Sequence, residues 1–277
     1  MEWLQAVGRD GLLGIPASWL AFAGFWLLLL LLAGAELAFP LRRQAASPPA
    51  RLVANFGMGI LNALLLSALP VSAVLAADWA AARGLGLFHL IALPPLPAFI
   101  LSLLAWSFAS YGLHVLAHHW PWLWRIHRVH HADTLFDLST GLRHHPAEPL
   151  YTLVLLAAFA VLLGLDPLAI GAYAVAAGIF ALWTHANIGL PPWAGRMLNW
   201  LLMTPAAHRI HHSAARHETD SNYGDVLTVW DRLFGTWRAA PAEESAAMRL
   251  GLGSGFDEEA GQLLAQLRLP LRPRSEA

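Results

Sequence analysis

The sequence contains no cysteine and no lysine, and charged residues make up only 13% of its 277 residues. The lack of cysteine excludes disulfide bonds, thiolate-bound structural zinc and cysteine-held iron–sulfur clusters. A net charge of −1 offers no basic surface of the kind that nucleic-acid binding needs. Ordinary soluble domains have about 25% charged residues. This composition therefore indicates a membrane protein.

Long stretches of the chain carry no Asp, Glu, Lys or Arg. Four such windows lie between Asp10 and Glu36, Arg51 and Asp78, Arg83 and Arg125, and Asp166 and Arg196. A helix needs about 20 apolar residues to cross a bilayer, and each window is longer than that. A shorter window, 149–165, predicts a short span or one arm of a membrane hairpin. The first apolar run, 19–39, is too long for the apolar region of a signal peptide, so we expect a retained helix.

The arginines predict the orientation. Three segments are rich in arginine, and all three lie on one side if every window spans: Arg42, Arg43 and Arg51; Arg125, Arg128 and Arg143; Arg196, Arg209 and Arg216. The other side has only Arg9 and Arg83. Basic loops stay in the cytoplasm. Because alanine, leucine and arginine dominate, as in GC-rich bacterial genomes, we expect a bacterial inner membrane protein.

Eight histidines form three groups with helical spacing: His114 and His118; His127, His130 and His131; His208, His211 and His212. Histidine is the commonest metal ligand, and residues three or four apart share one face of a helix. Adjacent histidines diverge by about 100 degrees, so one group can serve two neighbouring metals. Eight imidazoles are enough for two ions. All-nitrogen sites suit iron, copper or zinc.

Five further residues are weaker candidates. His185 ends an apolar window, and membrane histidines are usually functional, so we expect a ninth ligand or a contact to one. His145 is expected to be a ligand or a contact to one, and His217 a ligand or a surface residue. Asp225 and Asp231 are candidate carboxylate partners for metal-bound imidazoles. His144 is expected to face solvent or to have a structural role.

The order and spacing of these groups resemble those of the fatty acid hydroxylase/sterol desaturase superfamily. Three further strings agree with it: Arg143-His144-His145-Pro146-Ala147-Glu148, His185-Ala186-Asn187, and Asn222-Tyr223-Gly224 followed by Trp230-Asp231-Arg232-Leu233-Phe234-Gly235-Thr236. The resemblance covers about residues 98–238. The fatty acid 2-hydroxylases of this superfamily usually carry another H-x3-H box near this point. Here the residue four positions after His185 is Gly189, so the second histidine of that box is missing. The His-x-Asn form at His185 is more similar to the sterol desaturase branch.

The resemblance implies two iron ions, with zinc able to substitute in purified protein, that use O2 to hydroxylate or desaturate a C–H bond of a lipid. The lipid class stays open between fatty acyl, sterol-like and other isoprenoid substrates. A separate electron-donor protein is expected, because the sequence shows no flavin, iron–sulfur or cytochrome module. The alternatives are a metal-binding membrane transporter and a non-catalytic lipid-binding relative.

The expected fold is all-α, with four to five membrane helices and a cytoplasmic, helical, histidine-rich cap. Three regions are predicted: N-terminal membrane helices over 1–97, the catalytic domain over 98–240, and a cytoplasmic tail over 241–277. The third window contains Pro94, Pro95 and Pro97. Its membrane helix is therefore predicted to start near Ala98 and to run through Leu116. Thr204 and Pro205 are expected to open the helix of the last histidine group.

Overall fold

The computed structural model describes residues 17–240, 242–253 and 256–272, and these ranges contain helices and no strands. The helices are α2 (Ala17–Ala38), α3 (Pro49–Ser67), α4 (Ala73–Ala81), α5 (Leu87–Leu90), α6 (Pro95–His119), α7 (Pro121–His131), η1 (Leu138–Leu142), α8 (Ala147–Leu163), α9 (Pro167–His185), α10 (Pro192–Leu198), α11 (Pro205–His211), α12 (Arg216–Thr219), α13 (Val229–Phe234), α14 (Ala242–Ala247), η2 (Asp257–Glu259), α15 (Leu263–Arg268) and η3 (Leu269–Leu271). The predicted all-α fold is confirmed.

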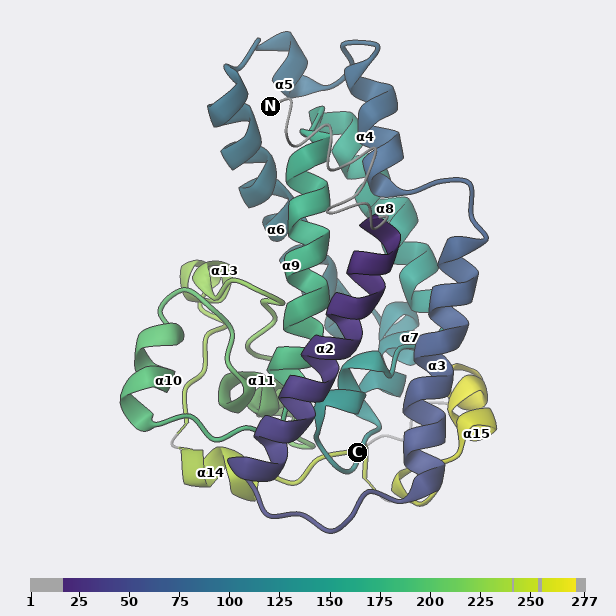
Figure 1. Ribbon diagram of the computed structural model, residues 1–277, viewed down its shortest axis with the longest axis vertical. Helices are drawn as coiled ribbons and strands as arrows, with labels where there is room; N and C mark the ends of the chain where they lie inside the picture. The colour runs from purple at the N-terminus through teal and green to yellow at the C-terminus, as the bar shows by residue number, and fades with distance from the viewer. Residues whose placement is uncertain (1–16, 241, 254–255, 273–277) are drawn as a thin grey trace.

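The long helices form an elongated bundle, and most of the short helices gather at one end of it (Figure 1). Among the described residues, α3, α6 and α9 are long and apolar enough to cross a membrane, while 22–38 of α2 and all of α8 are shorter apolar helices. Large apolar side chains such as Leu30, Val154 and Val175 remain about two-thirds exposed on the bundle. Such a surface is suited to lipid rather than water. The protein is therefore a polytopic membrane protein.

Helix α6 differs from its predicted limits at both ends. It begins at Pro95, three residues before Ala98, and it ends at His119 instead of Leu116. The first turn of a helix needs no backbone N–H donors, so Pro95 and Pro97 fit there without breaking the helix. Because the helix continues to His119, its last two turns carry His114 and His118 on one face.

Two further helices carry the other histidine groups, and α11 begins at Thr204 and Pro205 as predicted. Helix α7 follows α6 after Trp120 and has Pro121 in its first turn. Helix α11 has Thr204 as its N-cap, with the Thr204 hydroxyl accepting a hydrogen bond from the backbone N–H of Ala207, and Pro205 comes next. Helix α9 packs against α6, α11 and η1. These contacts bring two histidine-bearing helices, α6 and α11, against α9, and the third, α7, packs against α6.

A buried ionic network joins α3 to the loop after α7. The Arg51 guanidinium donates to both carboxylate oxygens of Asp133 at 2.6 and 2.8 Å, and to Asp137 at 2.6 Å. Burial alone would raise the pKa of Asp133, but the positive charges of Arg51 and Arg143 lower it below its usual range. Arg143 in turn donates to the side chain of Asn55 on α3 at 2.9 Å. These hydrogen bonds and ion pairs thus connect α3 to the histidine-bearing part of the chain.

Candidate metal centre

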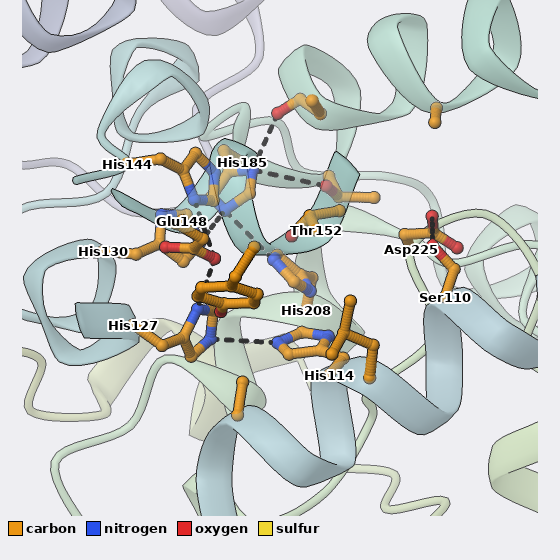
Figure 2. Close-up of a pocket in the computed structure, with 16 residues that line it drawn as sticks. Ser110, His114, His127, His130, His144, Glu148, Thr152, His185, His208 and Asp225 are labelled. Atoms are coloured by element: carbon orange, nitrogen blue, oxygen red, sulfur yellow. Dashed lines mark hydrogen bonds and ion pairs between the residues drawn. The ribbon is translucent and has the colours of Figure 1, made fainter. Parts of the chain in front are cut away.

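The nine histidines predicted as ligands lie together in two clusters, in each of which one nitrogen per ring lies within 4.8 Å of the others. Cluster A contains His114, His118, His127, His131 and His211. Cluster B contains His130, His185, His208 and His212. Figure 2 shows five of the nine converging on one cavity. Their role as metal ligands stays a prediction.

The two H-x-x-H-H groups each supply both clusters. On α7, His127 and His131 belong to cluster A and His130 to cluster B. On α11 and its C-cap the pattern is reversed, because the first and last histidines, His208 and His212, belong to cluster B. The first and last histidines of each group, four residues apart, therefore belong to one cluster. The middle histidine, three residues after the first, belongs to the other cluster.

The clusters adjoin each other through stacked rings. His131 of cluster A stacks on His212 of cluster B, with ring centroids 4.5 Å apart and planes 16° apart. His211 of cluster A stacks on His208 of cluster B, at 5.1 Å and 20°. Two ions held by these clusters would therefore be close neighbours and would share one surrounding protein shell.

The ring nitrogens that face each other are all Nε2 atoms. The Nε2 of His127 lies 3.1 Å from that of His114 and 3.2 Å from that of His131. In cluster B, the Nε2 of His185 lies 3.1 Å from His130, 3.1 Å from His212 and 3.0 Å from His208. Two nitrogens about 2.1 Å from one ion and at a right angle to each other are about 3.0 Å apart. These separations match ligands of one metal.

In several of these histidines the other ring nitrogen, Nδ1, points outward to a protein acceptor; the Nδ1 atom of His208 has none among the described residues. Nδ1 donates to backbone carbonyls from His114 (Tyr223, 2.7 Å), His130 (Arg143, 3.1 Å), His185 (Ala181, 2.7 Å) and His211 (Ser221, 2.8 Å). A carbonyl only accepts, so these Nδ1 atoms carry the proton and the inward Nε2 atoms carry lone pairs. Facing lone pairs repel unless a cation lies between them. The buried Nε2 atoms of His118 and His211 also lack any partner, so the donor set fits metal ions.

Burial keeps the imidazoles in the form that binds metal. Desolvation, helped by neighbouring histidines, lowers the pKa of five buried ligand candidates well below the usual value: His130, His131, His208, His211 and His212. Metal ligation requires neutral imidazole. The apolar surroundings thus favour the neutral, ligand-competent state at neutral pH.

Two carboxylates that the sequence reasoning did not propose contact the clusters. Glu148, in the first turn of α8, accepts from His127 Nδ1 at 2.8 Å, and Asp220 accepts from His118 Nδ1 at 3.3 Å. Such contacts orient a ligating imidazole and make it more basic. Glu148 ends the string Arg143–Glu148 that resembles the superfamily. That position was the one feature of the sequence that could have pointed to it. His144, expected to face solvent or to have a structural role, stacks on His130 at 4.2 Å and lies 3.3 Å from Glu148.

Four of the five weaker candidates lie outside both clusters: His145, His217, Asp225 and Asp231. His145 accepts from the backbone N–H of Ala147 and contacts the carbonyl of Leu267, so it shapes the start of α8. His217 is exposed, with its ring 3.9 Å from Glu218. Asp225 contacts no histidine. Asp225 instead accepts from Tyr173 and Ser110.

Asp231 acts on cluster A through the backbone. Its two carboxylate oxygens accept from the N–H groups of Tyr223 and Gly224, each at 2.8 Å. The carbonyl of the same Tyr223 accepts from His114 Nδ1. A Cβ on Gly224 would lie 2.1 Å from the Leu227 carbonyl oxygen, so only glycine fits at this position. Asp231 thus fixes the loop that orients His114.

A cavity of about 260 Å³ opens between α6, α8 and α9 against both clusters. Histidines of cluster A (His114 and His127) and of cluster B (His130, His185 and His208) form part of its wall. Leu113, Ala117, Ala177 and Ala181 supply the apolar part. Its volume is close to the lower end of ligand pockets, about 300 Å³. The cavity therefore fits a segment of a lipid rather than a whole lipid.

These features define a polytopic membrane protein whose histidine clusters are suited to bind metal ions. The chain belongs to the fatty acid hydroxylase family, whose model matches residues 99–236. It is 36% identical over 175 residues to an ornithine lipid hydroxylase of Rhizobium tropici. The aligned region covers 62% of this chain and 49% of that protein. The predicted superfamily is confirmed.

Other relatives act on different lipids. The chain is 31% identical over 169 residues to an alkylglycerol monooxygenase of Danio rerio, covering 60% of this chain and 35% of that protein. It is 29% identical over 153 residues to cholesterol 25-hydroxylase of Mus musculus, covering 53% and 48%. The chain thus spans about half or less of the length of these curated relatives. No solved structure matches it.

Proposed function

We propose that the protein is a membrane-bound di-iron oxidoreductase that uses O2 to oxidise a C–H bond of a lipid. The main observation that supports this proposal is the pair of adjoining all-histidine clusters, both of which line one cavity between membrane helices. Bound iron would supply O2 activation, and zinc would occupy the same nitrogens without redox activity. The hydroxylases and monooxygenases among its relatives favour hydroxylation over desaturation.

The residues of the chain position the reaction. Outward hydrogen bonds from Nδ1 fix the imidazoles of His114 and His185, among others, so that their Nε2 atoms stay aimed at the metal positions. The cavity wall between α6 and α9 is apolar at Leu113 and Ala177, which excludes water beside the clusters and accepts an alkyl segment. Because the surrounding helices expose apolar side chains, the substrate enters from the bilayer.

The location of the clusters favours an enzyme over a transporter. Transporters hold their ions near the membrane midplane on broken helices. Here His114 and His118 lie in the last two turns of α6, and His185 is the last residue of α9. The other six ligand candidates lie on α7, on α11 or at the C-cap of α11. We propose that this end faces the cytoplasm of a bacterial inner membrane, where a separate protein donates electrons.

Oxygen labelling tests the proposed function. The purified, iron-loaded protein in lipid membranes receives a reductant and an electron donor under oxygen-18 gas, and lipids are analysed by mass spectrometry. We expect a labelled hydroxylated lipid from the wild type and none from His211→Ala. His217→Ala, which removes an exposed histidine outside the clusters, is the matched control and should retain activity. A new double bond without label would instead indicate desaturation, and product from His211→Ala would refute the proposed ligand set.

A further inference from the structure

One wall of the cavity is polar but contacts neither cluster. Asp225 and Ser110 form it, on the side away from His144 and Glu148, as Figure 2 shows. Ser110 precedes His114 by four residues on α6, so the two side chains share a face and lie about 6 Å apart. This polar wall therefore lies one helical turn from cluster A.

Asp225 is held firmly yet retains a free acceptor position. Its Oδ1 accepts from the Tyr173 hydroxyl at 2.5 Å and from the backbone N–H of Val226 at 2.8 Å. Among the described residues, only the Ser110 hydroxyl donates to its Oδ2, at 3.2 Å. An ionised carboxylate offers about four acceptor positions. One position on Oδ2 thus stays open where Asp225 borders the cavity.

The partners of Asp225 are themselves fixed. The Tyr173 hydroxyl lies 3.2 Å from that of Ser107, which accepts from the indole N–H of Trp230 at 3.0 Å. Ser107 and Tyr173 are buried. This chain of contacts links α6, α9 and α13, so the carboxylate is held in place before any ligand arrives.

The charges around the cavity discriminate between ligands. Its lining residues include two carboxylates, Asp225 and Glu148, and no arginine, and the sequence has no lysine. The Oε1 atom of Glu148 is engaged by His127 and His144, while its Oε2 atom has no hydrogen-bond partner in the described part of the chain and lies on the side of the cavity away from Asp225. At Asp225 an anionic head group would face a carboxylate with no arginine or lysine in the cavity lining beside it, whereas a hydroxyl or an amine would find an acceptor there.

We propose that Asp225, together with Ser110, binds a hydrogen-bond-donating group of the lipid, a hydroxyl or an amine, and selects such lipids over fatty acids. The proposal rests on the proposed function for the reaction itself. Because the subsite lies one helical turn from cluster A, it also places the oxidised carbon near the polar group of the lipid, not at the far end of its alkyl chain.

Binding competition tests this subsite without measuring activity. Tritium-labelled hexadecan-1-ol is bound to the metal-loaded protein in detergent and displaced by hexadecan-1-ol, hexadecan-1-amine or hexadecanoate. A hydrogen bond to a charged group makes a difference of about tenfold or more. We therefore expect the alcohol and the amine to bind at least about tenfold more tightly than the acid, and Asp225→Asn to reduce that ratio to within about twofold. Asp78→Asn, at an exposed carboxylate on α4, should leave the ratio unchanged.

Tyr173→Phe provides a second variant if Asp225→Asn does not fold. It removes the hydroxyl that holds Asp225 and should lower the ratio by about threefold. Equal binding of alcohol and acid by the wild type, binding of none of the three, or an unchanged ratio in Asp225→Asn would each overturn the subsite. Labelled lipid product without the binding preference would leave the proposed function standing. The preference without any product would contradict the proposed function alone.

Discussion

Replacing Arg51 by methionine should destabilise the protein strongly, although Arg51 lies outside the family-matched region and contacts no candidate ligand. The guanidinium is 3% exposed and the Asp133 carboxylate 1%, so the substitution leaves a buried charge without its main partner. Removing one partner of such a pair destabilises by about 3–5 kcal/mol. Metal content should fall as well, because the same network holds Arg143, whose carbonyl accepts from His130.

Chemical unfolding in detergent, followed by tryptophan fluorescence, measures the effect. The double variant Arg51→Met/Asp133→Asn removes both charges and should recover about half of the loss. Arg83→Met is the matched control, since Arg83 lies on the exposed segment between α4 and α5 and should change stability by less than about 0.5 kcal/mol. A loss below about 1 kcal/mol in Arg51→Met, or a double variant less stable than the single, would refute the reasoning.

Three other outcomes are expected. Glu148→Gln should weaken metal binding about 10- to 100-fold by competition with a chelator, because His127 loses a carboxylate partner; Glu244→Gln, at an exposed position, should have no effect. Metal-free protein should melt at a lower temperature at about pH 5.5 than at about pH 8. Burial lowers the pKa of histidines such as His211, so below about pH 6.5 the unfolded chain binds protons that the folded protein does not. Acid therefore stabilises the unfolded state. An equal or higher melting temperature in acid would contradict this. A reporter fused after Arg238 should be active in the cytoplasm, and activity on the opposite side of the membrane would overturn the orientation.

Local patterns in the sequence predicted the helices and the histidine groups well. Helical periodicity needs only neighbouring residues, so the shared face of His114 and His118, or the N-cap at Thr204, is visible without a fold. The start of α6 was misjudged, because prolines that break a helix interior are acceptable in its first turn. The role of the grouped histidines as ligands remains a prediction that their arrangement supports.

Contacts between distant segments were not predictable in the same way. His118 meets Asp220, which is 102 residues away, and Arg51 meets Asp133, which is 82 residues away. Nothing in the spacing of either pair marks them as partners, since tertiary packing alone brings them together. Asp225 was expected to support a ligand, but the fold turns it toward Tyr173 and the cavity wall.

The crossed contribution of the two H-x-x-H-H groups means that the centre has no separable halves. Without the three histidines of the α7 group, three candidates would remain in each cluster. Without the three histidines of α11 and its C-cap, four would remain in cluster A and two in cluster B. No exchange of a single helix between relatives would transplant one complete site.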